Sequence, residues 1–429
     1  MVFGDMTHGV RSTLELGRVV FDGEVEMREA LLADTRFRAV LERSESPTLS
    51  ARRHLLLSAL RLNAKLSPEV FAALGHLRTV LGLETPVEAY CVSGAEINAF
   101  VVPPERGVLL MGITSAALEQ LDSEELRFVL GHEIGHAIFD HFRLSPDAFV
   151  EDDELAPVHI ARLCAWMRYA ELTADRVGLL SCDDFDAAVR AFFKLTSGLS
   201  GARFLQHAAD CATQYADVET QYFDSSEEDW FSTHPYSPLR IKALDAFARS
   251  TTYHGLRGRS SGEAKFHGLL GGRSSLLDEA GLEAEVRGVM RVMDPSFLRD
   301  DGDVTESVRE YLTLAGYAVA LADGKLARGE KQALGKLVGK RGLSRARKML
   351  LELSEVAHSA KLEELAANLR LKLGRNGRHK VIEDLVMIAL ADRELHQAEL
   401  EVLWTAAEQL QVAPELVERT LARFVGTLD

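Results

Sequence analysis

Residues 131–136 read Gly-His-Glu-Ile-Gly-His and place two histidines four positions apart. Positions i and i+4 share one face of a helix, so the imidazoles of His132 and His136 can reach a single ion. Glu133 lies beside that face, where its carboxylate can take a proton from water. This spacing is typical of zinc sites in hydrolytic enzymes. The motif alone is also compatible with two surface histidines on a helix, and that alternative stays open here.

A third metal ligand is expected from a second helix. Glu171 and Asp175 are four residues apart and therefore share a helix face. We predict that Glu171 binds zinc, and that Asp175 accepts a hydrogen bond from a ligand histidine and fixes its tautomer. Three protein ligands leave a fourth position for water, as in catalytic zinc sites. The sequence thus predicts one Zn²⁺ held by His132, His136 and Glu171.

Two helices have to position these side chains. Asp122 can cap a helix that begins near residue 123, with Glu125 as the reciprocal partner of a capping box. Pro157 is well suited to the first turn of the second helix. Three strand-like segments precede the motif and predict a small antiparallel sheet. They are residues 87–92, 97–102 and 108–114.

Self-similar segments near the C-terminus predict a second, all-helical part of the chain. Residues 314–337 resemble residues 383–406 at a constant offset, which implies two related helical hairpins packed together. We expect an α+β protein that is mostly α, in which a helical bundle follows a peptidase-type domain. The predicted segments are an N-terminal helical segment at 1–64, the site domain at 65–250, a linker or mobile segment at 251–305, and the helical bundle at 306–429.

Charge and hydropathy exclude several classes of function. The net charge is −16, and its negative excess lies before residue 306. Such a surface is poorly suited to phosphate neutralisation, so we expect no nucleic-acid partner. No apolar run reaches the roughly 18 residues that a membrane span needs, and the N-terminus lacks the apolar core of a signal peptide. We therefore expect a soluble, cytoplasmic protein.

Four motifs in order, INAF, HEIGH, ELTAD and STHPYSPLRI, resemble the HtpX-like and CAAX-prenyl-protease-like gluzincin metallopeptidases over about residues 65–250. The resemblance implies a zincin-like fold and a peptide or protein substrate. The sequence departs from that family's membrane-embedded members in one respect. Only 34 residues separate His136 from Glu171, and they contain SPDAFVEDDELAP, which cannot form a membrane hairpin.

The resemblance also implies roles for residues outside the metal motif. It implies that Asn98, with Ala99 and Phe100, lies on an edge strand that holds the substrate main chain. His234 would stabilise the oxyanion. Arg240 would lie on the following helix and face the site, and Tyr236 is a further substrate-binding candidate.

The function predicted from these residues is zinc-dependent endopeptidase activity, with water activated by the metal and Glu133 as general base. Two alternatives remain open at this point. The chain could be a catalytically silent zinc-binding scaffold that acts through its C-terminal domain. It could also be a latent peptidase whose cleft is covered by residues 200–232 or by the linker.

The C-terminal repeat resembles a TerB-like domain, of the tellurite-resistance type, over about residues 306–425. Asp323 aligns with Asp392, and Glu330 aligns with Glu399. The resemblance suggests a metal site at these four carboxylates and a regulatory partner for the domain. The alternative, which we favour, is that the aspartates cap turns and the glutamates support the helix starts that follow.

Overall fold

The protein was analysed as a computed structural model. The structure describes residues 16–44, 51–144, 157–222, 232–258, 276–294, 303–335 and 355–426, apart from residues 207, 209, 323, 327, 374, 393 and 394. The chain divides into two compact units. The first contains Met1–Ala148, Trp166–Val218 and Thr233–Met290, and the second contains Phe149–Ala165, Glu219–Ser232 and Arg291–Asp429.

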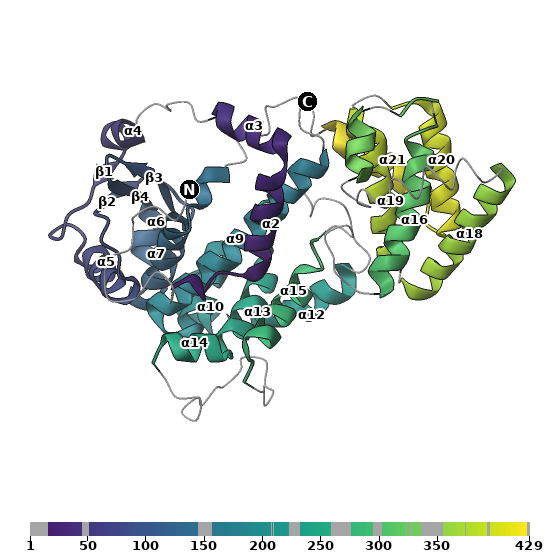
Figure 1. The fold of residues 1–429 in the computed structure, drawn as a ribbon. Helices are drawn as coiled ribbons and strands as arrows, with labels where there is room; N and C mark the ends of the chain where they lie inside the picture. The colour runs from purple at the N-terminus through teal and green to yellow at the C-terminus, as the bar shows by residue number, and fades with distance from the viewer. Residues whose placement is uncertain are drawn as a thin grey trace. The chain divides into compact units, whose positions relative to one another are not determined.

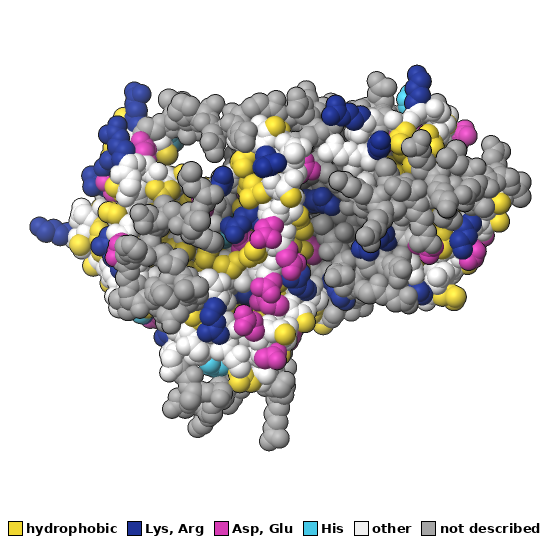
Figure 2. All heavy atoms as spheres, in the orientation of Figure 1, with side chains coloured by type: hydrophobic (Ala, Val, Ile, Leu, Met, Phe, Trp, Pro, Cys, Tyr) yellow, Lys and Arg dark blue, Asp and Glu magenta, His cyan; other side chains and the backbone are white. Residues whose placement is uncertain are grey.

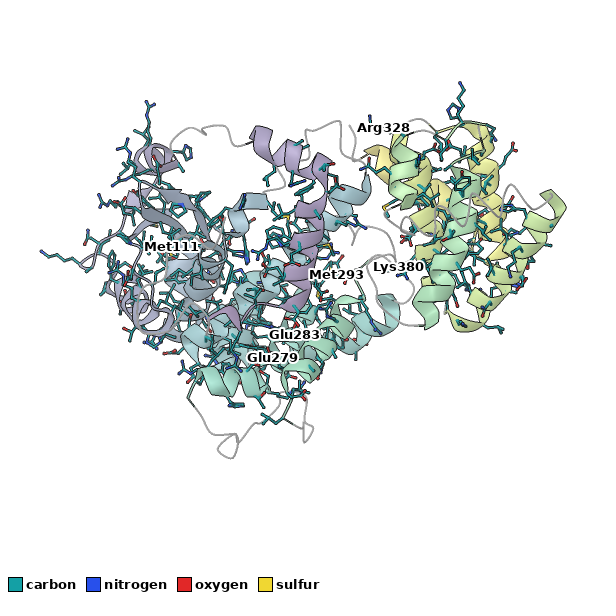
Figure 3. The ribbon with its side chains drawn as sticks, in the orientation of Figure 1. Met111, Glu279, Glu283, Met293, Arg328 and Lys380 are labelled. Atoms are coloured by element: carbon teal, nitrogen blue, oxygen red, sulfur yellow. The ribbon has the colours of Figure 1, made fainter. Side chains whose placement is uncertain are left out.

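A four-stranded sheet lies in the first unit, with strand order β1-β2-β4-β3 (Figure 1). Its strands are β1 (Leu60–Arg61), β2 (Val87–Val92), β3 (Ala99–Glu105) and β4 (Val108–Thr114). The central strand β4 is almost wholly apolar. Met111 of β4, labelled in Figure 3, pairs with Ala89 of β2 on one side and with Val101 of β3 on the other.

The expectation of an antiparallel sheet was wrong in one pairing, because β2 and β4 run parallel. The chain passes from β2 to the far edge, forms β3, and returns through a tight turn to fill the centre with β4. Arg106 and Gly107 both have positive φ in that turn. Pro103 and Pro104 lack the N–H groups that a central strand needs, so β3 is confined to the edge.

The N-terminal segment, expected to be helical, also contains the short strand β1. The helices before the sheet are α2 (Asp22–Ala33), α3 (Thr35–Ser44), α4 (Ala51–Ser58) and α5 (Pro68–Leu81). After the sheet, α6 (Ser115–Gln120) leads into α7 (Ser123–Ile138), which carries the histidine motif and packs against β3, α5 and α10 (Phe185–Ser197).

The start of α7 is fixed by the predicted capping box. The carboxylate of Asp122 accepts hydrogen bonds from the backbone N–H groups of Glu124 and Glu125, at 2.9 and 3.0 Å. Glu125 Oε2 in turn accepts from Asp122 N at 2.8 Å. Burial acts to raise the pKa of Asp122, but the Glu125 N–H and the guanidinium of Arg190 outweigh it and hold the pKa below its usual value.

Asp122→Ala is expected to lower the free energy of unfolding by roughly 0.5–2 kcal/mol at pH 7, because it removes the cap of α7. The lowered pKa means that the ionised cap stabilises the fold fully above about pH 4 and loses this effect as the pH falls through the folded-state pKa. Denaturant unfolding from pH 7 to pH 3 should therefore show the difference from wild type shrinking in acid. Neither Asp122→Asn nor Asp122→Ala titrates at this position, so the stability difference between these two variants should stay constant over this pH range, and a change in that difference with pH would contradict the explanation.

The metal-motif helix is followed by a short 3-10 helix, η1 (His141–Leu144), and later by the long helix α9 (Pro157–Cys182). The predicted linker at 251–305 is partly helical, since it contains α14 (Thr251–Leu256) and α15 (Glu279–Met290). Residues 259–275, within this predicted linker, lie outside the described residues. The other helices up to Met290 are α11 (Ala202–Leu205), α12 (Asp210–Tyr222) and α13 (Ser237–Ala248).

The second unit contains a helical bundle with its own apolar core, as expected from the C-terminal repeat. Buried side chains from each of the helices named next, within the described residues, form this core. These helices are α16 (Asp303–Val319), α18 (Glu355–Lys372), α19 (Arg375–Ala389), α20 (Gln397–Gln409) and α21 (Glu415–Gly426), with the 3-10 turn η4 (Leu390–Asp392) after α19. Of the helices in the described ranges, none is both long and apolar enough to cross a membrane.

The predicted carboxylates of the C-terminal repeat are only partly described. Asp323 and the side chain of Asp392 lie outside the described residues. Glu330 and Glu399 are buried. The Glu399 carboxylate accepts a hydrogen bond from the backbone N–H of His396 at the start of α20, at 2.7 Å. This hydrogen bond stabilises the start of α20, as expected if Glu399 supports a helix start.

Candidate metal centre

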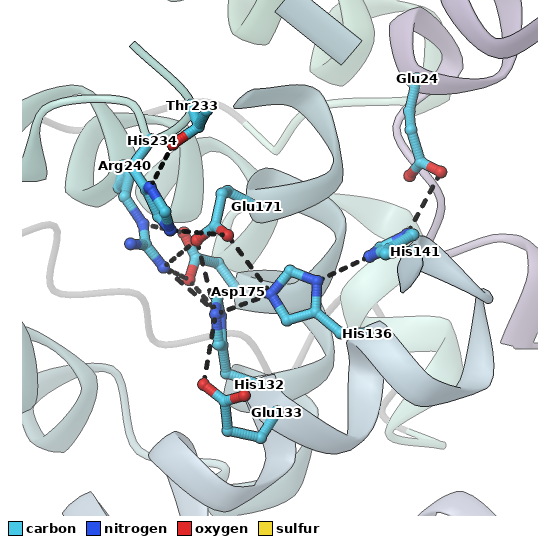
Figure 4. Close-up of polar contacts among 10 residues, drawn as sticks. All are labelled: Glu24, His132, Glu133, His136, His141, Glu171, Asp175, Thr233, His234 and Arg240. Carbon is cyan, nitrogen blue, oxygen red and sulfur yellow. Dashed lines mark hydrogen bonds and ion pairs between the residues drawn. The ribbon is translucent and has the colours of Figure 1, made fainter. Parts of the chain in front are cut away.

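Two helices bring the histidine motif and the predicted third ligand together. His132 and His136 project from α7, and Glu171 projects from α9 (Figure 4). The two imidazole Nε2 atoms are 3.1 Å apart. The Glu171 carboxylate oxygens lie 3.5 Å from Nε2 of His132 and 3.3 Å from Nε2 of His136. Among the described residues, this is the one group of three side chains placed to share a metal ion.

The donor spacing can be compared with what a zinc ion requires. Tetrahedral coordination with bonds of about 2.0–2.1 Å places neighbouring donor atoms roughly 3.3–3.4 Å apart. The three separations here bracket that value. In addition, Glu171 Oε2 is buried and accepts no hydrogen bond, although it lies 3.1 Å from Nη2 of Arg240. A His/His/Glu set with an unused carboxylate lone pair fits a divalent cation, and zinc in particular.

Glycines flanking the histidines allow α7 to approach α9 closely. A Cβ atom at Gly131 would lie 2.3 Å from the hydroxyl oxygen of Ser181. One at Gly135 would lie 3.1 Å from the Cα atom of Ala174. Larger side chains would push the helices apart and separate the imidazoles from Glu171. The two glycines therefore set the distance on which the site depends.

Asp175 and Arg240 form a charged support behind His132. Nδ1 of His132 lies 2.9 Å from Oδ1 of Asp175. Arg240, on α13, donates to both oxygens of Asp175, through Nε at 2.8 Å and Nη2 at 2.6 Å. Its guanidinium also lies over the ring of Phe192. The contact between Asp175 and Nδ1 of His132 orients the His132 ring and leaves its Nε2 free for a metal.

The charges within the site keep both α9 carboxylates ionised. Burial acts to raise the pKa of Glu171, but Arg240 and the two histidines outweigh it and hold the pKa well below its usual value. The pKa of Asp175 is lowered against the same effect of burial, mainly by Arg240. The site thus presents an ionised Glu171 carboxylate beside the imidazole nitrogens of the two histidines, a donor set that suits a divalent cation.

Glu133 differs from these two carboxylates, because burial raises its pKa above the usual value even though the two histidines oppose the shift. Its Oε1 lies 4.0 Å from Nε2 of His132, beside the metal-facing atoms. A carboxylate with a raised pKa accepts a proton more readily, which suits a general base.

His234 lies at the exposed rim of the site. Its Nε2 is 3.5 Å from Oε1 of Glu171, and its Nδ1 is 2.9 Å from the hydroxyl of Thr233. The side chain is 65% exposed, so it can reach a bound substrate. Tyr236 is half-buried at the N-cap of α13.

The predicted substrate-binding segment borders α7. Asn98 is exposed and immediately precedes the edge strand β3, which begins at Ala99. Phe100 packs in a small cluster with Leu55 and Leu110. This packing leaves the Phe100 side chain half-buried.

His141 follows His136 by five residues, a spacing that would take it off the metal face of a continuous helix. The structure places its Nδ1 2.8 Å from Nδ1 of His136 (Figure 4). Helix α7 ends at Ile138, and Asp140 has a φ of 54°, which turns the chain back over the motif. No sequence signal beyond the polar residue itself indicated this turn.

The fold and the site define a class: an α+β domain in which two adjacent helices supply a His/His/Glu metal-binding set. Comparison with protein families identifies the family. Residues 67–147 and 154–248 match Peptidase family M48, and residues 309–422 match the family described as Tellurite resistance protein TerB. The chain thus joins an M48-family domain to a TerB domain.

Individual relatives support the same assignment. The chain is 28% identical over 199 residues to the plastoglobule-localized metallopeptidase 48 of Arabidopsis thaliana, which covers 42% of this chain and 57% of that protein. It is 24% identical over 230 residues to a protease HtpX homolog of Ralstonia nicotianae, covering 46% of this chain and 80% of the relative. A match of 26% identity to human mitochondrial metalloendopeptidase OMA1 covers 36% of this chain and 31% of that protein.

Proposed function

We propose that this protein is a zinc-dependent endopeptidase. The observation that carries the proposal is the convergence of two imidazoles from α7 and one carboxylate from α9, with donor atoms 3.1–3.5 Å apart. Membership of its N-terminal part in Peptidase family M48 supports peptide-bond hydrolysis.

His132, His136 and Glu171 would hold the metal. When bound, zinc supplies Lewis acidity, which lowers the pKa of water and polarises a carbonyl group. The protein's share is to keep the three donors in place. Asp175 orients the His132 ring, and Arg240 fixes Asp175 through two hydrogen bonds.

Glu133 moves the proton. Its carboxylate takes a proton from the attacking water and later delivers it to the amine of the leaving peptide. The raised pKa of Glu133, caused by burial, favours the first transfer.

His234 is placed to stabilise negative charge on the substrate. Its exposed ring can donate a hydrogen bond to the oxygen that becomes negative as the carbonyl is attacked, a contribution of roughly 3–4 kcal/mol for such a donor. Tyr236, two residues on, is a weaker candidate for a substrate contact.

The substrate is proposed to be an extended peptide segment. The outer edge of β3 lies beside α7, and an added strand could pair with its main chain. Asn98, Ala99 and Phe100 lie at the start of this edge. The main chain of Asn98 is hydrogen-bonded to Thr114, so Asn98 would contact the substrate through its exposed side chain, and the next outward main-chain groups belong to Ala99.

The purified full chain is expected to cleave an unfolded protein such as casein, and to lose this activity on treatment with a metal chelator. Adding Zn²⁺ after removal of the chelator should restore cleavage. Fragment appearance on gels measures the activity, and circular dichroism checks the fold. Cleavage that persists in the chelated, metal-free protein would exclude the proposal.

A further inference from the structure

A chain of buried polar contacts leads from His136 away from the metal-facing atoms. Nδ1 of His136 lies 2.8 Å from Nδ1 of His141. Nε2 of His141 lies 3.3 Å from Oε1 of Glu24, which projects from α2 (Figure 4). The second oxygen of Glu24 accepts a hydrogen bond from the hydroxyl of Thr173, on α9, at 2.5 Å.

Glu24 is unlike the other acidic residues of its helix. Asp22, Glu26 and Glu29 are exposed, and Figure 2 shows acidic side chains gathered over α2. The Glu24 side chain, in contrast, is fully buried. Burying a carboxylate without partners would cost several kcal/mol. A fully buried Glu24 therefore needs the contacts with His141 and Thr173 that it makes.

The facing atoms of Glu24 and His141 depend on one another. Glu24 Oε1 and His141 Nε2 are both buried, and neither makes a hydrogen bond elsewhere within the described residues. Their 3.3 Å separation places Nε2 of His141 directly against the Glu24 carboxylate. Burial acts to raise the pKa of Glu24, but His141 and Thr173 outweigh it and lower the pKa, which keeps the carboxylate ionised.

With a metal at His136, only one arrangement of protons satisfies every contact in the series from His136 through His141 to Glu24. Nε2 of His136 faces Glu171 and must present a lone pair to a metal, so its Nδ1 carries the hydrogen. That hydrogen is donated to Nδ1 of His141. The remaining N–H of His141, on Nε2, then points at the Glu24 carboxylate. Both rings are neutral, and each N–H meets an acceptor.

We propose that Glu24 and His141 are positioning residues that hold His136 in the tautomer and orientation needed for metal binding. This inference rests on the proposed metal centre. His132 is oriented directly by a carboxylate, whereas His136 is oriented through a second imidazole. Helix α2 thereby completes the metal centre, although it lies before residue 67, where the match to the peptidase family begins.

The hydroxyl of Thr173 links this support to the helix that carries Glu171. It donates to Glu24 and accepts from the backbone N–H of Phe21 at 3.1 Å. Helix α9 therefore supplies a metal ligand at Glu171, the partner of His132 at Asp175, and the anchor of Glu24 at Thr173. If Glu24 only fastened α2 to the core, replacing it would leave the zinc affinity of the folded protein unchanged.

The test is the Zn²⁺ affinity of the full chain, measured by competition with a chromophoric chelator. Glu24→Gln is expected to weaken zinc binding by about tenfold, and His141→Phe by up to about 100-fold. His141→Asn should lose less than His141→Phe, because the amide oxygen stands near the position of Nδ1 and can accept from His136. Glu26→Gln, on the exposed face of α2, is the matched control and should bind like the wild type.

The order of the two His141 variants separates positioning from packing. Phenylalanine fills the volume of the imidazole, whereas asparagine leaves a gap, so a packing role predicts that the Asn variant is the worse one. Wild-type affinity in Glu24→Gln and both His141 variants would overturn the inference, as would stronger zinc binding by His141→Phe than by His141→Asn. A wild-type protein that binds no zinc would instead overturn the proposed function. If Glu24→Gln does not fold, the His141 pair alone decides.

Discussion

Replacing Glu133 with glutamine is expected to reduce peptide hydrolysis by about 10²–10⁴-fold while the protein keeps its metal. The amide has nearly the same shape as the carboxylate but cannot accept the proton of the attacking water. Glu133 is not among the metal-binding atoms of the proposed site, so zinc content should be unchanged. Initial rates on a fluorogenic peptide and metal analysis of the same samples measure both quantities.

Glu124→Gln provides a matched control on the same helix. Glu124 lies in the first turn of α7 and pairs with Arg127 at 2.6 Å, away from the histidines. Its removal should leave the rate near that of the wild type. Equal rates in Glu133→Gln and wild-type protein would instead favour the scaffold interpretation, in which the zinc site has no catalytic base.

Glu171→Ala is expected to abolish stable zinc binding, taking the metal content from about one ion per chain to almost none. Loss of a residue that contacts a ligand typically costs 10–100-fold in affinity, and loss of a ligand itself should cost more. The variant also leaves Arg240 with fewer carboxylate partners in a buried site, so some loss of stability should accompany the loss of metal.

Metal analysis after dialysis measures the outcome, and thermal unfolding shows whether the variant is folded. Asp186→Asn is a suitable control, because Asp186 is an exposed acid on α10. Full zinc occupancy in folded Glu171→Ala would remove this carboxylate from the ligand set and with it the basis of the proposed activity.

The parts of the site that follow from local geometry could be predicted from the sequence. The spacing of His132 and His136 fixes them on one helix face, and the capping box at Asp122 fixes where that helix begins. The facing of Glu171 toward the histidines depends on how two helices pack. Only the small residues in the motif, Gly131 and Gly135, hinted that the approach would be close.

Other features depended on the path of the chain and could not be predicted. The turn at Asp140 returns His141 to His136, which helical periodicity cannot anticipate. Glu24 reaches His141 from far away in the sequence. The parallel pairing of β2 with β4 was missed because strand composition does not show which strand of a hairpin takes the centre. Pro103 and Pro104 were the available signal that β3 lies at the edge.

The same two prolines limit the length of a substrate peptide that could pair with β3 in the proposed peptidase. A guest strand laid along β3 would find outward backbone N–H groups only at Ala99 and Val101, because those of Phe100 and Val102 face β4 in the antiparallel ladder. Pro103 and Pro104 have no N–H, and the pairing becomes irregular between Val102 and Glu105. So short a main-chain pairing would favour the binding of short, unfolded segments of varied sequence over the docking of a folded protein.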